Sequence, residues 1–253
     1  MPSWAELSEQ VSRLVEAEGF AGFLRWEPIL RTMFVGSPPW ISVELDALLE
    51  DDAKYGTRWR VALREDQVGS PMPCTLYPES SGNLIHHAYH VLQIERAFGR
   101  RVSDYRTIVE FGGGYGSLCR LIHRLGFTGK YSIYDLPAFS ALQRRYLAAV
   151  GIHGVECVEG PGVVISRGEL SPALFIATWS LSESPLEVRE SVERGLNNFD
   201  NILIAYQESF DGIDNLTYFQ DLARRFEVFS WHDEEIAHLP GSRYLFGTRQ
   251  SGN

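Results

Sequence analysis

The sequence predicts an α/β protein: an N-terminal helical extension followed by a doubly wound, mostly parallel seven-stranded sheet with an antiparallel last strand. Residues 1–104 read as helices broken by turn-forming segments, whereas residues 105–253 read as short apolar runs alternating with helical patterns. Near the junction, one apolar run leads into a glycine-rich loop that opens a helix. We therefore divide the chain into a helical extension, 1–104, and a sheet core, 105–253.

The composition is that of a globular protein, since 44% of the 253 residues are hydrophobic and 22% are charged. A formal net charge of −10 argues against a nucleic acid partner. No basic start precedes an apolar run and no stretch nears about 18 consecutive apolar residues, so neither export nor membrane insertion is expected. The three cysteines form no CxxC pair, which suits a reducing cytoplasm.

The N-terminal half opens with a helix behind Ser3, a suitable N-cap, because apolar residues follow it at helical spacing. The run 70–82 is rich in proline, serine and glycine and is expected to be a loop. Asn83 is the expected N-cap of a helix over 84–98. This helix leads into the sheet core.

In the C-terminal half, each apolar run is expected to be a buried strand and each helical pattern a crossover between strands. The expected strands are 107–109, 131–134, 155–158, 174–177, 201–205, 226–231 and 243–248. The expected helices are 117–125, 139–150, 187–197 and 215–225. The loop between the last two strands is too short for a crossover helix, so this pair is expected to run antiparallel.

The sharpest motif runs from Glu110 to Gly116 and reads Glu-Phe-Gly-Gly-Gly-Tyr-Gly. Glycines let the backbone of such a loop approach a ligand, and the following helix N-terminus presents N–H groups to it. A dinucleotide fingerprint would place its third glycine at position 117, where this chain has Ser117. The loop therefore predicts a nucleotide-type cofactor and fits a dinucleotide only in part.

Two acids accompany the loop. Asp135 ends the next strand, about 20 residues further on, where a carboxylate accepts hydrogen bonds from both hydroxyls of a ribose. Glu110 directly precedes the loop, and its negative charge would oppose a pyrophosphate but tolerate a cationic sulfonium and amino group. The pair favours S-adenosylmethionine over NAD. A structural glycine turn with two surface acids is the alternative.

The glycine loop, the Tyr-Asp-Leu-Pro segment at 134–137 and the terminal strand pair resemble the class I S-adenosylmethionine-dependent methyltransferases, whose fold is Rossmann-like. This resemblance covers about residues 105–250. With Trp-Ser-Leu-Ser-Glu at 179–183 and Ala-Tyr-Gln-Glu at 205–208, the same segments resemble a family of bacterial sugar O-methyltransferases.

The resemblance implies that the alternate glycines of the loop cradle the methionine part of the cofactor and that Asp135 binds its ribose. The residue at the adenine stays open between Glu156 and Glu159. The expected cofactor-binding residues, all in the loop or at strand ends, are Glu110, Gly112, Gly113, Gly114, Tyr115, Gly116, Asp135, Leu136, Thr178 and Trp179.

Methyl transfer to a hydroxyl needs alignment in a dry pocket and a base for the hydroxyl proton. In a doubly wound sheet these groups belong at the carboxyl ends of the strands. Trp179 can pack on a cofactor or sugar ring there, and Glu183 can orient or deprotonate a hydroxyl or simply begin a helix. Glu208 follows the fifth strand, with a structural role equally open. In the last loop, His238 is favoured over His232 because a Pro-Gly turn shapes its position.

A histidine cluster, His86, His87 and His90, stands near the start of the 84–98 helix. His86 and His90 share a helical face as two metal ligands would, but no third ligand is evident, so a divalent metal stays open and is not predicted. In the structural alternative, His87 packs in the core while His86 and His90 are solvated. In the catalytic alternative, His86 or His87 is the base, since imidazole accepts protons near neutral pH.

These observations predict a cytoplasmic S-adenosylmethionine-dependent O-methyltransferase that forms S-adenosylhomocysteine and methylates a hydroxyl of a sugar or glycosylated metabolite in secondary metabolism. Residues 1–104 would build the pocket for this small-molecule or glycan acceptor, and a homo-oligomer stays open. The candidate catalytic residues are His86, His87, Glu183, Glu208 and His238.

Three rival functions remain at this point. The acceptor group of a methyltransferase could instead be another natural-product hydroxyl or an amine. A NAD-dependent oxidoreductase or epimerase would use the same loop, but Ser117 and the lack of a Tyr-x-x-x-Lys pair argue against it. A non-catalytic scaffold is disfavoured because the glycine loop is intact.

Overall fold

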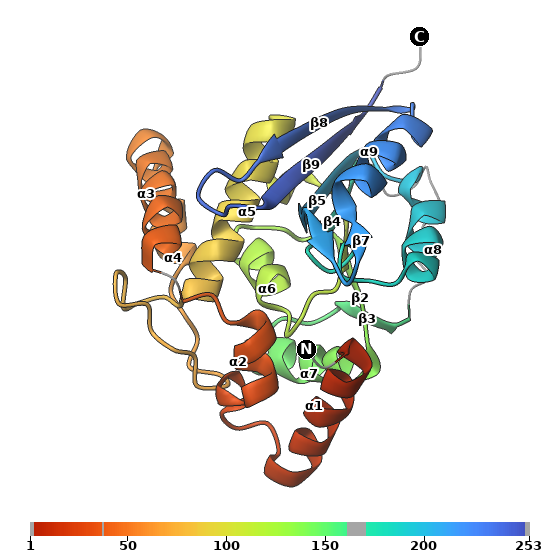
Figure 1. Cartoon of the computed structure of the whole chain (residues 1–253). Coiled ribbons are helices and arrows are strands. Elements are labelled where there is room, and N and C mark those ends of the chain that lie inside the picture. The colour runs from red at the N-terminus through yellow and green to blue at the C-terminus, as the bar shows by residue number, and fades with distance from the viewer. Residues whose placement is uncertain (1–2, 37, 161–170, 251–253) are drawn as a thin grey trace.

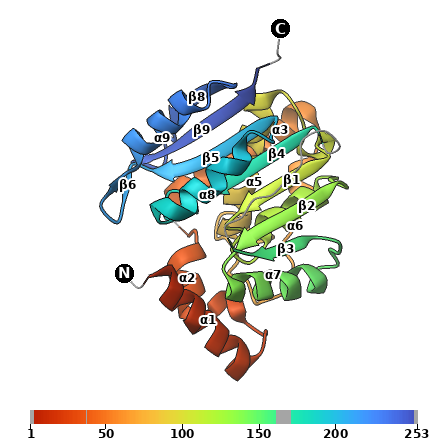
Figure 2. The same cartoon turned by 90° about the vertical axis from the view of Figure 1, so that its right-hand side faces the viewer.

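A computed structural model of the chain describes residues 3–36, 38–160 and 171–250, and its centre is a seven-stranded sheet with helices on both faces (Figure 1). The strand order is β3-β2-β1-β4-β5-β9-β8 (Figure 2). Neighbouring strands pair in parallel except at β9, which runs antiparallel to both β5 and β8. The predicted doubly wound, mostly parallel sheet with an antiparallel last strand is confirmed.

The elements follow the predicted alternation closely from residue 105 onward. The strands of the sheet are β1 (Thr107–Phe111), β2 (Lys130–Asp135), β3 (Glu156–Glu159), β4 (Ala173–Thr178), β5 (Asn201–Gln207), β8 (Phe229–Glu235) and β9 (Ser242–Arg249). The helices of this half are α6 (Ser117–Arg124), α7 (Pro137–Ala149), α8 (Leu186–Leu196) and α9 (Asn215–Arg225). A short hairpin, β6 (Ser209–Phe210) and β7 (Ile213–Asp214), was not predicted.

The N-terminal half is helical, as predicted. Its elements are α1 (Trp4–Glu18), η1 (Phe23–Arg25), α2 (Glu27–Met33), α3 (Pro38–Tyr55), α4 (Arg58–Ala62), α5 (Gly82–Phe98) and η2 (Val102–Asp104). Ser3 caps α1 as expected, because its hydroxyl accepts the N–H of Glu6 while the Glu6 carboxylate accepts the N–H of Ser3. In Figure 1, α1 and α2 lie together at one end of the molecule and α3 stands at its outer side.

The central strands β1, β4 and β5 bury both faces, and their side chains alternate between two apolar cores. Ile108 of β1 belongs to the core shared with α5, α6 and α7, whereas the next residue, Val109, belongs to the core shared with α8 and α9. In β5, Leu203 belongs to the first of these cores and Ile202 to the second. This is the period of two that a strand imposes on its side chains. Both faces are therefore covered, as a parallel sheet requires.

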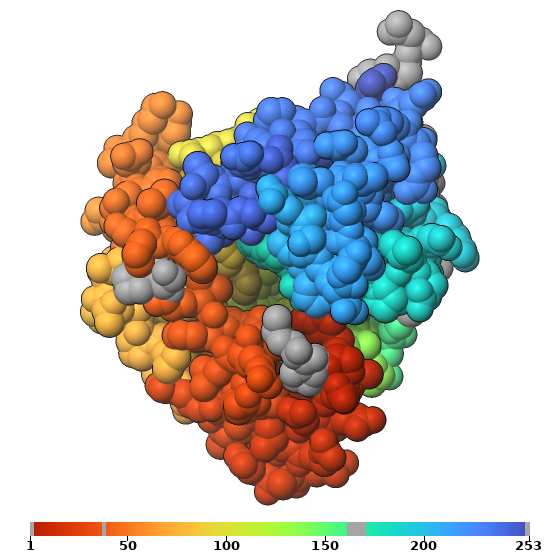
Figure 3. Space-filling view, in the orientation of Figure 1, coloured from red at the N-terminus to blue at the C-terminus, as the bar shows by residue number. Residues whose placement is uncertain are grey.

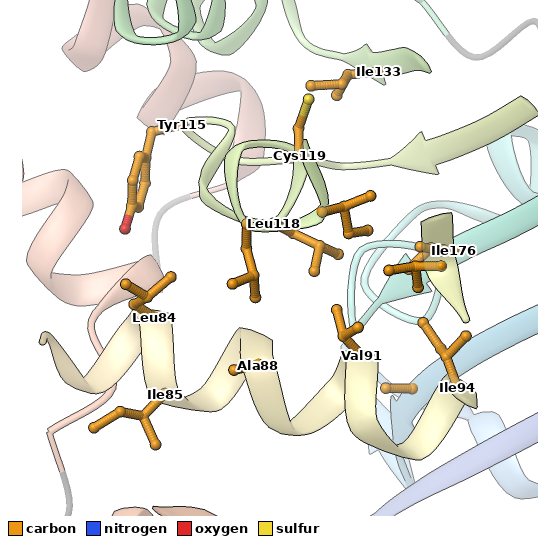
Figure 4. Packing of buried hydrophobic residues seen from close by; sticks show 14 of the residues in the cluster. Leu84, Ile85, Ala88, Val91, Ile94, Tyr115, Leu118, Cys119, Ile133 and Ile176 are labelled. Atoms are coloured by element: carbon orange, nitrogen blue, oxygen red, sulfur yellow. The ribbon is translucent and has the colours of Figure 1, made fainter. Parts of the chain in front are cut away.

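Helix α5 packs against α6 on the face of the first core. Leu84, Ala88 and Val91 point from α5 toward Leu118 and its neighbours on α6 (Figure 4). All of these side chains are buried. The helical extension and the sheet core thus share one continuous apolar cluster, which holds α5 and its histidines in a fixed position beside the sheet.

The structure corrects the N-cap expected for α5. The cap is Ser81, whose hydroxyl accepts the N–H of Leu84 at 3.2 Å. The side-chain oxygen of Asn83 instead accepts the N–H of Val35 at 2.7 Å. The chain at Val35 runs so close that a Cβ on Gly82 would lie 1.9 Å from its carbonyl oxygen. A contact with a distant segment therefore decided which residue caps the helix.

The structure also corrects the bounds of the sixth sheet strand, expected at 226–231. Phe226 closes α9 through its N–H to Leu222, and β8 begins at Phe229. The strand continues to Glu235, so His232 lies in β8 rather than in the final loop. Since β8 is an edge strand, polar side chains are tolerated along it and a hydrophobic run is a poor guide to its end.

Among the helices described, from Trp4 to Arg225, every one is too short or too polar to cross a lipid bilayer.

Candidate active site

The glycine loop lies at the carboxyl edge of the sheet, where the loops after β1, β2 and β4 meet. Gly112 has φ +75° and donates its N–H to the carbonyl of Tyr134 at 2.8 Å. A Cβ on Gly112 would lie 2.2 Å from Cβ of Ser180, which follows β4. A side chain at this position would thus collide as well as strain the backbone. Glycine is what lets the three loops come together.

Glu110 lies in β1 directly beneath this loop. Its carboxylate accepts the hydroxyl proton of Tyr131 at 2.8 Å, and a Cβ on Gly113 would lie 3.1 Å from its carboxyl carbon. Burial raises the pKa of Glu110 to about 7, the Tyr131 hydrogen bond acts against this rise, and nearby Asp135 adds to it. An acid in this position favours a cation at the loop, because a cation would stabilise the ionised carboxylate.

Asp135 ends β2 beside the same loop. It accepts hydrogen bonds from the N–H of Gly114 at 3.0 Å, the N–H of Leu136 at 2.8 Å and the amide of Gln143 at 2.8 Å. Burial raises the pKa of Asp135 to about 7 in spite of these donors. An ionised carboxylate has about four acceptor sites, so three protein donors leave room for a ligand hydroxyl. Glu110, Asp135 and the glycine loop together fit an adenosine cofactor that carries positive charge.

Trp179 follows Thr178, the last residue of β4, and turns the chain back over the sheet edge. It has φ +60° and donates its N–H to the carbonyl of Ala205 at 2.7 Å. Its indole stacks on the imidazole of His86, with 5.4 Å between ring centres and 30° between planes. The next hydroxyl, of Ser180, donates to the carbonyl of Phe111 in β1. Trp179 therefore joins the loop region to the histidines of α5.

Glu183 lies further along the same loop, where α1 reaches it. Its carboxylate accepts the side-chain amide of Gln207 at 3.4 Å and a side-chain hydrogen bond from Trp4. Trp4 also packs edge to face against Phe139, the third residue of α7, at 6.2 Å between ring centres. Burial raises the pKa of Glu183 to about 7, against the lowering by these two donors. The start of α1 thus bridges α7 and the loop after β4.

A fully buried arginine holds this loop from below. Arg189 of α8 donates to the carbonyls of Ser182 and Ser184 and to the side-chain oxygen of Asn215, the last at 2.8 Å. The amide of Asn215 donates in turn to the carbonyl of Gln207 at 2.9 Å. These bonds tie the loop after β4 to the end of β5 and so position Glu183.

The structure brings His86 and His238 together on an acid that the sequence analysis did not single out. Oε1 of Glu44, in α3, lies 2.7 Å from Nδ1 of His86 and 2.9 Å from Nε2 of His238. Glu44 is completely buried, and its other carboxylate oxygen has no hydrogen bond within the described residues. Burial would raise the pKa of Glu44, but its hydrogen bonds to His238 and His86 hold it below the ordinary value. Its carboxylate is therefore ionised beside two imidazoles.

The other predicted candidates lie in contrasting surroundings. His87 is next to His86 but its Nδ1 is buried without a partner in the described chain, and burial lowers its pKa to about 3. Glu208 follows β5 at the correct edge, and its side chain is exposed to solvent. The expectation that His86 and His90 are solvated is wrong, since His86 is 7% and His90 is 0% exposed. They face the interior because α3 and β9 cover that side of α5.

Metal binding gains no support from the described residues. Within 3–36, 38–160 and 171–250, no group of three or more His, Cys, Asp or Glu side chains is arranged to hold a metal ion. His86 and His90 do approach each other, with 3.1 Å between their Nε2 atoms, but their other nitrogens bind Glu44 and Tyr244. Hydrogen bonding thus accounts for both imidazoles.

One signal in the sequence could have pointed to Glu44. Ile41, Leu45 and Leu48 form the buried stripe of α3, and Glu44 lies on the same helical face, three residues after the first of them. An acid within an apolar stripe is rarely buried without a partner. That pattern would have marked Glu44 as paired, although not with which residue.

No protein-family profile matches the chain, and no curated protein matches it. Solved structures with a similar chain path include mitomycin 7-O-methyltransferase MmcR, 16% identical with a TM-score of 0.45, covering 97% of this chain and 84% of that one. A SAM-dependent methyltransferase from Aquifex aeolicus is 15% identical with a TM-score of 0.46, covering 63% and 89%. YcgJ from Bacillus subtilis is 10% identical with a TM-score of 0.49, covering 65% and 100%. At identities this low, the likeness is one of fold and says nothing of activity.

Proposed function

We propose that this protein is an S-adenosylmethionine-dependent O-methyltransferase acting on a hydroxyl of a sugar or glycosylated metabolite. The observation that carries the proposal is the pair of carboxylates, buried Glu110 and half-buried Asp135, at a glycine loop on the carboxyl edge of the sheet. The sheet order supports it as well, since a dinucleotide-binding sheet is parallel in the order 3-2-1-4-5-6, whereas here an antiparallel strand enters between β5 and β8.

The chain offers a matching group for each part of this cofactor. The glycine loop from Gly112 to Gly116 would accommodate the methionine part, with Glu110 facing its positive charge. Asp135 would accept the ribose hydroxyls, and Leu136 and Trp179 would border the adenosine and the acceptor. When bound, S-adenosylmethionine supplies a methyl group that is already activated by its positive sulfur, so the protein's task is to align and deprotonate the acceptor.

Among the histidines, His238 is the best placed to take the acceptor's proton. Its Nε2 faces the ionised Glu44 at 2.9 Å, so that nitrogen carries the proton and Nδ1 holds the free electron pair. Nδ1 forms no hydrogen bond within the described part of the chain, whereas both nitrogens of His86 are engaged. Glu44 would stabilise the imidazolium that forms when Nδ1 accepts the hydroxyl proton, as the acid of a catalytic triad does.

The acceptor is proposed to lie between the N-terminal helices and the loops after β4, β5 and β8. Figure 3 shows the surface hollowed between the red and orange N-terminal helices and the blue C-terminal strands. Trp179 offers a ring face, and Glu183 and Glu208 offer acceptors for hydroxyl groups. In this proposal residues 1–104 act as the acceptor-binding part and residues 105–253 as the cofactor-binding part.

Titration calorimetry of the purified protein with S-adenosylmethionine, S-adenosylhomocysteine and NAD tests the cofactor. We expect heat from the two adenosyl sulfur compounds and none from NAD, and their binding should be lost in Asp135→Ala. A transfer assay with radiolabelled methyl groups, screened over monosaccharides, nucleotide sugars and glycosides, then tests the acceptor. Binding of NAD alone would replace the proposal by an oxidoreductase.

A further inference from the structure

A chain of buried hydrogen bonds continues from His86 away from Glu44. Nε2 of His86 lies 3.1 Å from Nε2 of His90, and Nδ1 of His90 lies 2.5 Å from the hydroxyl oxygen of Tyr244 in β9. His90 and Tyr244 are almost completely buried, and neither has a part in the proposed chemistry. Two imidazoles and a phenol in one buried line are costly to desolvate, so their arrangement calls for a role.

The donors in this line can be assigned from its Glu44 end. Ionised Glu44 only accepts, so Nδ1 of His86 must donate to it. A neutral His86 then has its electron pair on Nε2, which accepts the Nε2–H of His90. Burial lowers the pKa of His90 well below the ordinary value, so His90 is neutral and its Nδ1 accepts from the hydroxyl of Tyr244. Every hydrogen bond in the line is then satisfied, and each donor points toward the Glu44 end.

The opposite direction fails at Tyr244. It would place the proton of His90 on Nδ1, and the hydroxyl oxygen of Tyr244 would become an acceptor. The O–H of Tyr244 would then need another partner, and the described residues offer it none besides His90. A buried hydroxyl without an acceptor is unfavourable. The hydroxyl of Tyr244 therefore requires that the hydrogen bonds are donated from Tyr244 toward Glu44 and not the other way.

We propose that Tyr244 and His90 are positioning residues that support the Nδ1–H tautomer which Glu44 imposes on His86, and so help to keep two N–H donors on Oε1 of Glu44. If Nδ1 of His86 lost its proton, its electron pair would face the carboxylate and repel it, and the pair between Glu44 and His238 would be disturbed. The consequence for catalysis rests on the proposed function, in which His238 is the base. The assignment of the tautomers does not depend on that function.

Nitrogen NMR of the full chain labelled with ¹⁵N-histidine tests the tautomers directly. In the unmodified protein, long-range ¹H–¹⁵N correlations should show His86 protonated at Nδ1 and His90 protonated at Nε2. In Tyr244→Phe, which keeps the ring, His90 should shift toward a mixture of tautomers because it loses the donor at its Nδ1, and His86, whose Nδ1–H still faces Glu44, should shift less. The matched control is Tyr105→Phe, since Tyr105 is also buried and donates to Asn201 at 2.8 Å, but at the amino edge of the sheet. This control should leave the histidine signals unchanged.

A His90 protonated at Nδ1 in the unmodified protein, or unchanged tautomers in Tyr244→Phe, would overturn the inference. A second arm uses the transfer assay once an acceptor is found: Tyr244→Phe should lower kcat on the order of tenfold, a small part of the loss that a wholly wrong tautomer causes in a catalytic triad. The KM for S-adenosylmethionine should stay within about twofold, because Tyr244 itself has no contact with the glycine loop and the line reaches the cofactor side only through the ring of Trp179. Failure of the proposed function would leave no transfer to measure but would not alter the NMR result.

Discussion

Glu44 illustrates how one side chain organises a site whose other members are far away in the sequence. It is contributed by α3, whereas His86 comes from α5 and His238 from the turn between β8 and β9. A buried carboxylate is stable only when donors surround it. Two imidazole N–H groups meet this need on one oxygen, and in return the acid decides which nitrogen of each ring carries the proton.

The proposed base leads to a first prediction at this scale. His238→Gln should lower kcat on the order of 10²- to 10⁴-fold, because general bases contribute about this much, while calorimetric affinity for S-adenosylmethionine stays unchanged. His232→Gln is the matched control, since His232 lies in β8 of the same hairpin and is exposed, and its contacts are an ion pair with Glu234 and a ring contact with Phe246. Equal activity of the two variants would contradict the assignment of His238.

The acids at the glycine loop lead to a second prediction, on pH. Both Glu110 and Asp135 have a pKa raised to about 7, so a cationic cofactor that needs them ionised must displace their protons below pH 7. Affinity for S-adenosylmethionine should therefore rise from pH 5.5 to 7 and level off above, by up to about tenfold per pH unit for each linked proton. Calorimetry in buffers of different ionisation enthalpy measures the protons released.

The matched variant for this pH dependence is Glu110→Gln. Its affinity for S-adenosylmethionine should depend less steeply on pH, and the dependence that remains should come from Asp135. For the free protein, the same raised pKa makes a rising pH unfavourable: it lowers stability, whereas it raises the affinity for the cofactor. Above pH 4.5 the unfolded chain ionises Glu110 while the fold resists, so the stability of the free protein should fall as the pH rises toward 7. An affinity that does not change between pH 5.5 and 7 would exclude a cation beside these acids.

Among the elements, α8 supports the site although it never touches it. Its Arg189 fills the space under the loop after β4 and donates to three acceptors, while its guanidinium lies 4.7 Å from the ring centre of Tyr218. The ordering of the loop that carries Glu183 therefore depends on α8 and α9 packed together as well as on bonds within the loop, such as that from the Ser184 hydroxyl to the Ser180 carbonyl at 2.8 Å.

This support leads to a third prediction. Arg189→Met should lower the free energy of unfolding by roughly 2–4 kcal/mol, because two backbone carbonyls and one amide oxygen lose a buried donor. Arg224→Met on α9 is the control, since Arg224 is exposed and forms a surface ion pair with Asp221, and its effect should be within about 0.5 kcal/mol. Urea denaturation followed by circular dichroism measures both. A loss below 1 kcal/mol for Arg189→Met would mean that water replaces the arginine.

On the scale of the whole molecule, the helical extension and the sheet core share one apolar core. The first apolar core joins Leu84, Val91 and Ile94 of α5 to Leu118 of α6 and Ile176 of β4 (Figure 4). These contacts lie on the same helix as His86 and His90. The position of the histidines against the sheet is thus set by the same packing that stabilises the fold.

A fourth prediction follows for the separated sheet core. A fragment of residues 105–253 exposes the face of the sheet that α5 covers and should lack fixed tertiary structure, with weak near-ultraviolet circular dichroism and poorly dispersed amide signals. The full chain should unfold in a single cooperative transition when heated. A fragment with native-like dispersion would show that residues 105–253 form an independent domain.

The order and type of the sheet-core elements could be predicted because they depend on local patterns. Apolar runs and helical spacing marked β1 to β5 and α6 to α9 to within a few residues, and the short final loop gave the antiparallel strand. The proximity of the glycine loop and Asp135 could be predicted equally well, since a parallel sheet places strand ends at one edge. The bounds of β8 and the cap of α5 were wrong, because an edge strand and the contact with Val35 override local preference. The β6–β7 hairpin was missed, and the burial of His86 and His90 depended on packing that no local pattern shows.

The sequence alone therefore determined the sheet, its doubly wound connections and the place of the glycine loop, because these follow from periodicities of two and 3.6 residues. Only the tertiary structure decided which polar groups meet. Glu44 and His238 are 194 residues apart in the chain, and Tyr244 is 154 residues from His90. No local pattern encodes such a pairing, since it depends on how α3, α5 and the last hairpin pack, and on the need of each buried polar group for a partner.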